Sequence, residues 1–220
     1  MSFHVLKCSI IYRQTDITNK VDAKMKMLFK VCFIIGVSLV IGVPTVWYLY
    51  PKPIVQSESF ETGFNDWIAD ADVPMDPNNP GHHVAWNISR VATRAYSGQY
   101  SVALFIDGRQ DDGTVWIERK ISAKNSSEVR VKITFQLYSE QESFNTIAGV
   151  CAYVGLSNPE EETDFEVIGN ANEVAGWKAY SHTATLNTGS NGEIWVAVGI
   201  TVRWETQMTY NVDDAEIVVS

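Results

Sequence analysis

The chain has 220 residues, of which 45% are hydrophobic and 20% charged, with a formal net charge of −9. This composition is globular, and the length suffices for one sizeable domain plus an appendage. The charge is uneven, because residues 51–220 hold 11 Lys/Arg against 24 Asp/Glu, a net of −13, whereas residues 1–50 are net positive. A domain this acidic repels a nucleic-acid backbone, so nucleic-acid binding is set aside.

Residues 31–50 contain no charged side chain, and three lysines stand in the seven residues before them. A helix of about 20 residues crosses the roughly 30 Å hydrocarbon core of a bilayer. The stretch therefore predicts a transmembrane helix, with the N-terminus in the cytoplasm and the rest of the chain outside a cell membrane. The alternative is a cleaved signal peptide, but its apolar run would be shorter and would end in small residues. This run ends in the aromatic residues Trp47, Tyr48 and Tyr50.

The predicted organisation has four parts. A cytoplasmic segment covers residues 1–30, the membrane helix 31–50, a linker 51–56, and an extracytoplasmic domain 57–220. Residues 1–27 show no usable hydrophobic pattern, and Met25 and Met27 stand directly before the apolar run. We therefore expect translation to begin at one of these two methionines. Detection of a peptide upstream of Met25 by mass spectrometry would contradict this expectation.

Beyond residue 55 the hydrophobic pattern has a period of two, which is typical of strands with one face in a core. Strands are predicted around residues 102–106, 115–121, 131–138 and 194–204, and near 83–91, 147–155, 178–186 and 209–219. Asp111-Asp112-Gly113 predicts a hairpin turn, and residues 70–83 and 158–162 are expected to be acidic loops. Trp177 and Trp204 are assigned to the core. Eight or more short strands favour an all-β sandwich or jelly roll.

Five blocks in order resemble the CenC-type carbohydrate-binding modules of the galactose-binding-like jelly-roll superfamily. Residues 57–67 (SESFETGFNDW) are similar to the family's opening, and AYSGQYSV at 95–102 is similar to its "A-x-SG-x-YSL" strand. The further blocks are a "Y-x-v-s-F-w-v" strand at 129–138, a "G-W-t" turn at 176–178 and a closing "y-vDDV-x-l" at 210–217. The resemblance covers residues 57–220 and implies a jelly-roll β-sandwich. Fold analogy alone does not establish function.

The resemblance implies a structural calcium ion, held here by Glu58 or Glu61, a carbonyl near Ser97, and Asp213. Calcium prefers several hard oxygen ligands, which an acidic edge supplies. Strand parity is consistent with this, since Asp213 shares a face with three residues expected in the core, where an unpaired carboxylate is costly. These residues are Ala215, Ile217 and Val219. The alternative is a pair of exposed aspartates at a strand end.

The resemblance also implies a sugar groove, which needs aromatic rings beside polar groups. Parity places aromatic and polar side chains on the non-core faces of three predicted strands, which would form a platform if those strands share a sheet. The alternative is that loops cover the tryptophans, which then complete a second small core. The predicted ligand-binding residues are Trp116, Trp195, Arg203, Tyr138, Gln136 and Trp86, with Trp67 as a further wall.

The expected function is therefore a membrane-anchored extracytoplasmic module that binds a glycan. The alternative is a structural or protein-interaction ectodomain of the same fold, such as an accessory subunit of a membrane complex. No catalytic motif is present, so no enzyme activity is expected. A tethered hydrolase would need two carboxylates facing each other across a groove. Exposure of Trp116 and Trp195 together would discriminate a sugar site from the alternative.

Overall fold

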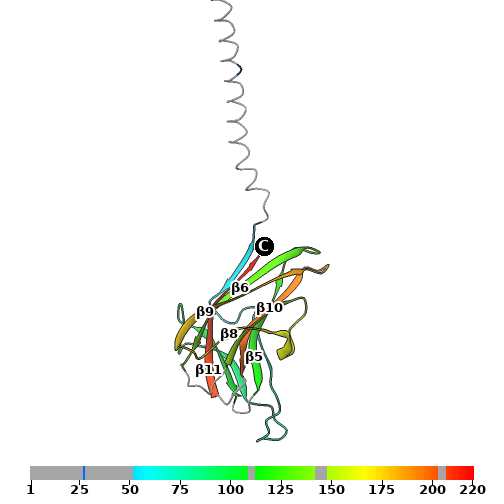
Figure 1. Cartoon of the computed structure of the whole chain (residues 1–220). Helices are drawn as coiled ribbons and strands as arrows, with labels where there is room; N and C mark the ends of the chain where they lie inside the picture. The colour runs from blue at the N-terminus through cyan, green and yellow to red at the C-terminus, as the bar shows by residue number, and fades with distance from the viewer. Residues whose placement is uncertain (1–26, 28–51, 109–111, 142–147, 203–206) are drawn as a thin grey trace, which may run out of the picture. The chain divides into compact units, whose positions relative to one another are not determined.

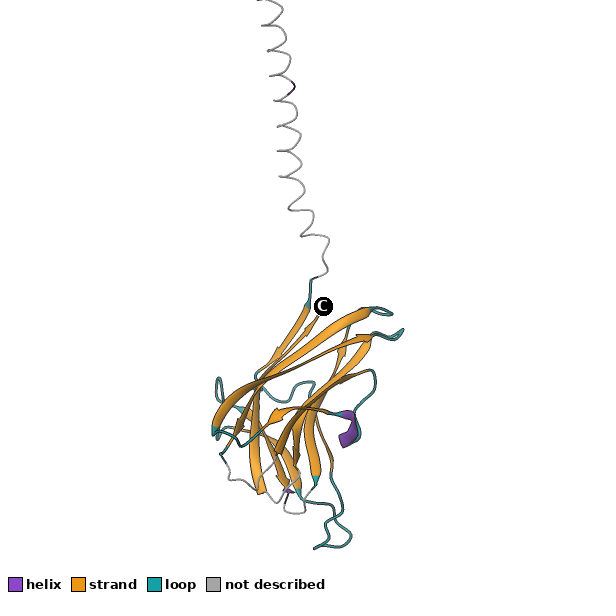
Figure 2. Cartoon of the chain, in the orientation of Figure 1, coloured by secondary structure: helices purple, strands orange, loops and turns teal. Residues whose placement is uncertain are grey.

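The computed structural model describes residues 27, 52–108, 112–141, 148–202 and 207–220. Two antiparallel sheets face each other across one hydrophobic core (Figure 1; strands are orange in Figure 2). In the described part of the chain no helix is both long and apolar enough to cross a membrane. The predicted span at residues 31–50, the N-terminal segment before it apart from Met27, and Trp204 lie outside the described residues.

Sheet A has the order β3-β4-β11-β6-β9, with β1 paired to the second half of β11. Sheet B has the order β2-β5-β10-β7-β8. The strands of sheet A are β1 (Ile54–Glu58), β3 (Trp86–Val91), β4 (Ser101–Asp107), β6 (Glu128–Ser139), β9 (Gly176–Asn187) and β11 (Gln207–Val219). Those of sheet B are β2 (Ile68–Asp72), β5 (Gly113–Ser122), β7 (Ala148–Gly155), β8 (Glu166–Asn170) and β10 (Glu193–Val202).

Period-two alternation builds the core, as expected from the sequence. In β6, Val131, Ile133 and Phe135 are buried, whereas the intervening Lys132 is exposed. In β10 the residues that face the core are Ile194, Val196, Val198, Ile200 and Val202. The all-β prediction and all eight predicted strands are confirmed, and the chain passes back and forth between the two sheets as in a jelly roll. Residues Pro53–Ser220 form one compact unit.

Three details of the prediction are wrong. The hairpin at Asp111-Asp112-Gly113 does not form, because β4 pairs with β3 and β11 while β5 pairs with β2 and β10. That connection crosses from sheet A to sheet B. Asp70 and Asp72 belong to strand β2 and not to a loop. Trp177 is paired with Tyr138 on the outer face of sheet A and is outside the core.

A β-bulge in β11 shifts the face on which the later residues lie. Asp213 pairs with Gln136 and Glu216 pairs with Thr134, so three steps on β11 match two on β6. Such a bulge carries one extra residue, here at Asp214, whose φ is 46°. As a result Tyr210 and Val212 face the core before the bulge, Ala215 and Ile217 face it after, and Asp213 lies on the outer face. The parity argument for Asp213 was therefore wrong.

Candidate functional site

The predicted ligand-binding residues do not lie on one surface. Trp116 and Trp195 lie on the outer face of sheet B, whereas Gln136 and Tyr138 lie on the outer face of sheet A. Trp86 is on the core-facing side of the edge strand β3, where it is opposite Ile106 and 38% exposed. Arg203 lies outside the described residues, and Trp67 is buried in the core. The expectation of one shared platform is corrected, because β6 belongs to the other sheet.

Trp116 has 0% of its surface exposed, so its ring cannot stack on a sugar in this structure. Phe165 packs against it with ring centroids 4.8 Å apart, and Tyr153 lies beyond Phe165 at 6.0 Å. The indole Nε1 donates a hydrogen bond of 2.7 Å to Glu118. Trp116 thus completes a second small core on the outer face of sheet B, the arrangement given above as the alternative. Because Trp116 is buried, Trp116 and Trp195 are not exposed together, and the criterion given above for a sugar site at this pair is not met.

The segment 156–165 covers that second core through polar contacts. Glu162 accepts a hydrogen bond of 2.9 Å from the Thr114 hydroxyl, and its own backbone N–H donates to Asp72 at 2.9 Å. The Tyr153 hydroxyl donates to the carbonyl of Ser157 at 2.9 Å. These contacts join the segment to β2, β5 and β7. The acidic loop predicted at residues 158–162 is therefore a cover of sheet B.

Glu118 is a buried carboxyl beneath this cover, 2% exposed. Burial raises its pKa above the ordinary value, against the opposing hydrogen bonds from Trp116 and Asn158. The nearby charges of Asp70 and Glu160 raise the pKa further. A carboxyl in such surroundings favours its neutral form. Because Glu118 is buried beneath the cover, we assign it no role in binding.

The outer face of sheet A carries a row of three side chains across neighbouring strands. Asn211 of β11 is opposite Tyr138 of β6, which in turn is opposite Trp177 of β9. Tyr138 and Trp177 make an edge contact with centroids 5.6 Å apart. Tyr96, which is 50% exposed, touches Trp177 at the same centroid distance. Three aromatic rings and one amide therefore lie together on a face that is partly open to solvent.

Arg94 and Glu140 fix the position of the central ring. The Arg94 guanidinium stacks on Tyr138 at 3.6 Å from the ring centroid and pairs with Glu140 at 2.7 Å. The Tyr138 hydroxyl donates to the same carboxylate at 3.2 Å. The Arg94 hydrogen bond is the main reason that the pKa of Glu140 is lowered. Because the cation and the carboxylate neutralise each other, this part of the face has no net charge.

An open groove of about 450 Å³ continues from this row along β11. Asn211 belongs to both the groove and the row, and Arg94 and Glu140, which contact Tyr138, also line the groove. The remaining lining residues are Thr93, Gln207, Met208 and Thr209. The side chains of Gln207 and Thr209 face solvent along the groove, whereas Asn211 is 5% exposed and its amide donates to the Ser101 hydroxyl at 3.1 Å. Period-two parity could identify Tyr138, but not Tyr96, whose loop places it on this face by contacts with residues distant in the sequence.

Two carboxylates hold the loop that carries Arg94 and Tyr96. Asp213, with 0% of its surface exposed, accepts hydrogen bonds from the backbone N–H groups of Tyr96 at 2.8 Å and Ser97 at 3.1 Å. Glu61 accepts from Gln99 at 2.9 Å and Tyr100 at 2.8 Å. These bonds lower the pKa of Glu61. The two side chains thus fix five consecutive residues of backbone beside the aromatic row.

The predicted calcium ligands make hydrogen bonds to N–H donors in this structure, and the calcium site stays a prediction. The carboxylates of Glu61 and Asp213 face N–H donors, whose partial positive charge would repel a cation. Glu58 accepts from the backbone N–H of Phe60 at 2.9 Å and from Asn65 at 2.6 Å. Within the described ranges, no group of three His, Cys, Asp or Glu side chains could hold a metal ion.

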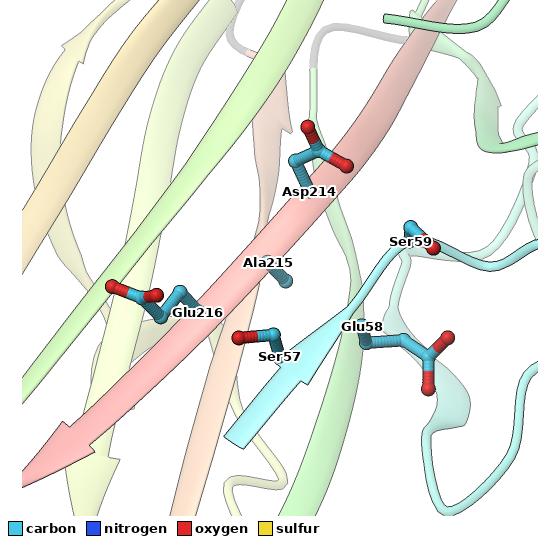
Figure 3. Close-up of a pocket in the computed structure, with 6 residues that line it drawn as sticks. All are labelled: Ser57, Glu58, Ser59, Asp214, Ala215 and Glu216. Carbon is cyan, nitrogen blue, oxygen red and sulfur yellow. The ribbon is translucent and has the colours of Figure 1, made fainter. Parts of the chain in front are cut away.

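A second pocket, of about 320 Å³, lies where β1 meets the bulge of β11. Figure 3 shows its three carboxylates, Glu58, Asp214 and Glu216, pointing in different directions. Asp214 accepts a hydrogen bond of 2.7 Å from the Ser97 hydroxyl. Because these carboxylates diverge, they form neither a metal cage nor the facing acid pair that a glycosidase needs.

No protein-family model matches the sequence, and no curated protein matches it. Among solved structures, the CBM22-1 xylan-binding domain of Paenibacillus barcinonensis Xyn10C has 15% identity and a TM-score of 0.48, over 77% of this chain and 97% of that one. TmCBM61 in complex with β-1,4-galactotriose has 14% identity and a TM-score of 0.42, over 72% and 92%. The K1 cleaved adhesin domain of Lys-gingipain from Porphyromonas gingivalis has 14% and 0.44, over 74% and 97%.

Several similar structures are thus carbohydrate-binding modules, of types other than CenC. Likeness of this degree does not transfer a ligand, because one sandwich architecture serves many functions. The CenC-type resemblance stays a prediction.

Proposed function

We propose that residues 53–220 are a non-catalytic glycan-binding module whose site is the row Asn211–Tyr138–Trp177 with the adjoining groove. The proposal rests on one observation: partly exposed aromatic rings lie beside amide and hydroxyl groups on one sheet face. Sugars bind by stacking CH faces on rings while their hydroxyls exchange hydrogen bonds with polar groups. Trp177 and Tyr96 provide the stacking surface, and the exposed Gln207 and Thr209 of the groove provide donors and acceptors.

The charges favour a neutral glycan. Arg94 is already paired with Glu140, and Lys178 next to Trp177 pairs with Glu173 at 3.3 Å. Neither cation is therefore free to hold a carboxylate or sulfate, and the net charge of −13 over residues 51–220 repels polyanions. A neutral polysaccharide meets no such barrier.

A glycan array probed with the domain, beside the variants Tyr96→Ala and Trp177→Ala, tests the proposal. Removal of either ring should weaken binding to neutral glycans about tenfold or more, the loss expected for an anchor residue. Trp86→Ala is the control, because it removes a tryptophan from the core-facing side of sheet A, away from the row. A folded wild-type domain that binds no glycan would contradict the proposal and favour the protein-interaction alternative.

We propose further that residues 31–50 anchor this module in a cell membrane with the domain outside. The support is the uncharged stretch of twenty residues and the lysines before it.

A further inference from the structure

We propose a second glycan-binding surface on the opposite sheet, centred on Trp195, which makes the domain bivalent. The inference rests on the function proposed above for the class of its ligand, a neutral glycan. Trp195 lies near one end of β10 in the middle of sheet B, and its neighbours Ile194 and Val196 are fully buried. The indole therefore lies on the outer face, where it is partly exposed.

The flank of Trp195 toward β7 is built by a glycine and a tyrosine. Gly155 is the cross-strand partner of Trp195, and a methyl group at Gly155 would lie 1.9 Å from the Tyr153 hydroxyl oxygen. The phenol group of Tyr153 thus occupies the space above Gly155. Opposed Cβ positions in an antiparallel pair are roughly 5 Å apart, so the hydroxyl lies about that far from the base of the indole. A hydrogen bond to Ser157 holds it there.

The flank toward β5 is polar and electrically neutral. Lys120, the partner of Trp195 on that strand, pairs with Glu193 at 3.0 Å, and both side chains are about half exposed, at 49% and 40%. The surface thus combines an indole ring, a phenol hydroxyl and an exposed ion pair. This is the combination of stacking surface and hydrogen-bonding groups that a sugar requires.

Trp116 on the same face shows what a covered tryptophan looks like in this domain. Its ring contacts Phe165 and its Nε1 is bonded to Glu118. Trp195 has no ring contact with another aromatic side chain among the described residues. The cover formed by 156–165 is anchored at the Trp116 end of the sheet on Thr114 and Asp72, and it reaches the flank of Trp195 through the hydrogen bond between Tyr153 and Ser157. The Trp195 end of the face is the part left accessible.

The two surfaces face in opposite directions, because they lie on the outer faces of the two sheets of one sandwich. One continuous sugar chain of ordinary length would have to wrap around the domain to reach both. Two such sites therefore bind separate chains, and the domain cross-links them. A surface that presents many glycan chains can engage both sites at once, so the overall affinity exceeds that of either site without any new contact.

The test compares Trp195→Ala, Trp177→Ala and their double variant with the wild-type domain, using soluble neutral polysaccharides (xylan, β-glucan, galactan and mannan). Affinity electrophoresis measures binding, titration with the corresponding hexasaccharide measures stoichiometry, and turbidity of the long polymer measures cross-linking. We expect two sites per wild-type domain, one in each single variant and none in the double variant. Only the wild type should make the long polymer turbid.

Lys120→Ala provides a second variant of the Trp195 surface and should weaken the same site, and Trp86→Ala is again the control. Full binding by Trp195→Ala, with all binding lost in Trp177→Ala, would overturn the second surface while the proposed function stands. Binding that only Trp195→Ala abolishes would overturn both the site proposed on sheet A and the bivalence, and would leave the Trp195 surface as a single site. A folded wild-type domain that binds none of the polymers would overturn both.

Discussion

At the scale of single residues, Glu118 ties the stability of the fold to pH. Burial raises its pKa above the ordinary value of 4.5, so the folded chain holds this proton more tightly than the unfolded chain. The stabilisation is fully present below the unfolded pKa and is lost as pH rises through the folded pKa. Glu118→Gln keeps an acceptor for Trp116 and removes the ionisation. We expect the variant to unfold at a higher temperature than the wild type at pH 7 and at a similar one near pH 4.

The test is the difference in melting temperature between the two proteins, measured from pH 4 to pH 8. The titration of all other groups cancels in this difference. Wild-type and variant curves that run parallel over the whole range would show that Glu118 keeps its ordinary pKa in the folded state.

Asp213 is the second residue whose substitution should lower the stability of the fold. It accepts three backbone N–H groups, those of Tyr96, Ser97 and Asp214. In Asp213→Ala these donors lose their partner, which should lower the free energy of unfolding by about 1–3 kcal/mol. Asp213→Asn should recover part of the loss, since its amide oxygen can still accept. Urea denaturation measures both.

The exposed Glu128→Ala is the control for this pair and should leave stability within about 0.5 kcal/mol. Hydrogen exchange at Tyr96 and Ser97 adds a local readout, because these amides should exchange faster in Asp213→Ala. Unchanged exchange there would show that the loop is held by other contacts.

At the scale of elements, Gly155 in β7 is a position where a larger residue would displace the neighbouring Tyr153 side chain. An alanine methyl group would collide with the Tyr153 phenol, which must then leave Ser157. Overpacking of this kind costs about 1–3 kcal/mol. We expect Gly155→Ala to be destabilised and to exchange amide hydrogens faster in the segment 156–165. The double variant Gly155→Ala, Tyr153→Ala should show no additional loss beyond Tyr153→Ala alone, because the collision is gone.

The elements also show what the sequence could predict and where it failed. Alternation located the strands well, because one face of each is committed to the core. It could not assign strands to sheets, so Tyr138 and Trp195 were expected on one surface although β6 and β10 lie in different sheets. One extra residue at Asp214 reversed the parity at Asp213. Tyr96 was missed because a loop held by Glu61 and Asp213 has no periodicity to read.

At the scale of the whole molecule, calcium is the first quantity to test. An ion that binds the folded state alone would raise the melting temperature by mass action. Because Glu61 and Asp213 face N–H donors, we expect the melting temperature of the domain to be the same in EDTA and in millimolar calcium. A rise with calcium that Asp213→Asn abolishes would restore the predicted site and require these side chains to turn.

The predicted anchor determines where any glycan would be met, and it can be tested apart from binding. The full chain should stay in the membrane pellet after an alkaline carbonate wash, because an uncharged run of twenty residues is long enough to span the bilayer. A chain lacking residues 1–52 should leave the pellet. The positive-inside rule places the domain outside, so protease added to intact cells should remove the domain and leave a short membrane-bound fragment. Protection of the domain from protease would show that the domain lies inside the cell, opposite to the predicted orientation. Release of the full chain by carbonate would show that residues 31–50 do not anchor it in the membrane. Either result would change where the domain could meet a glycan.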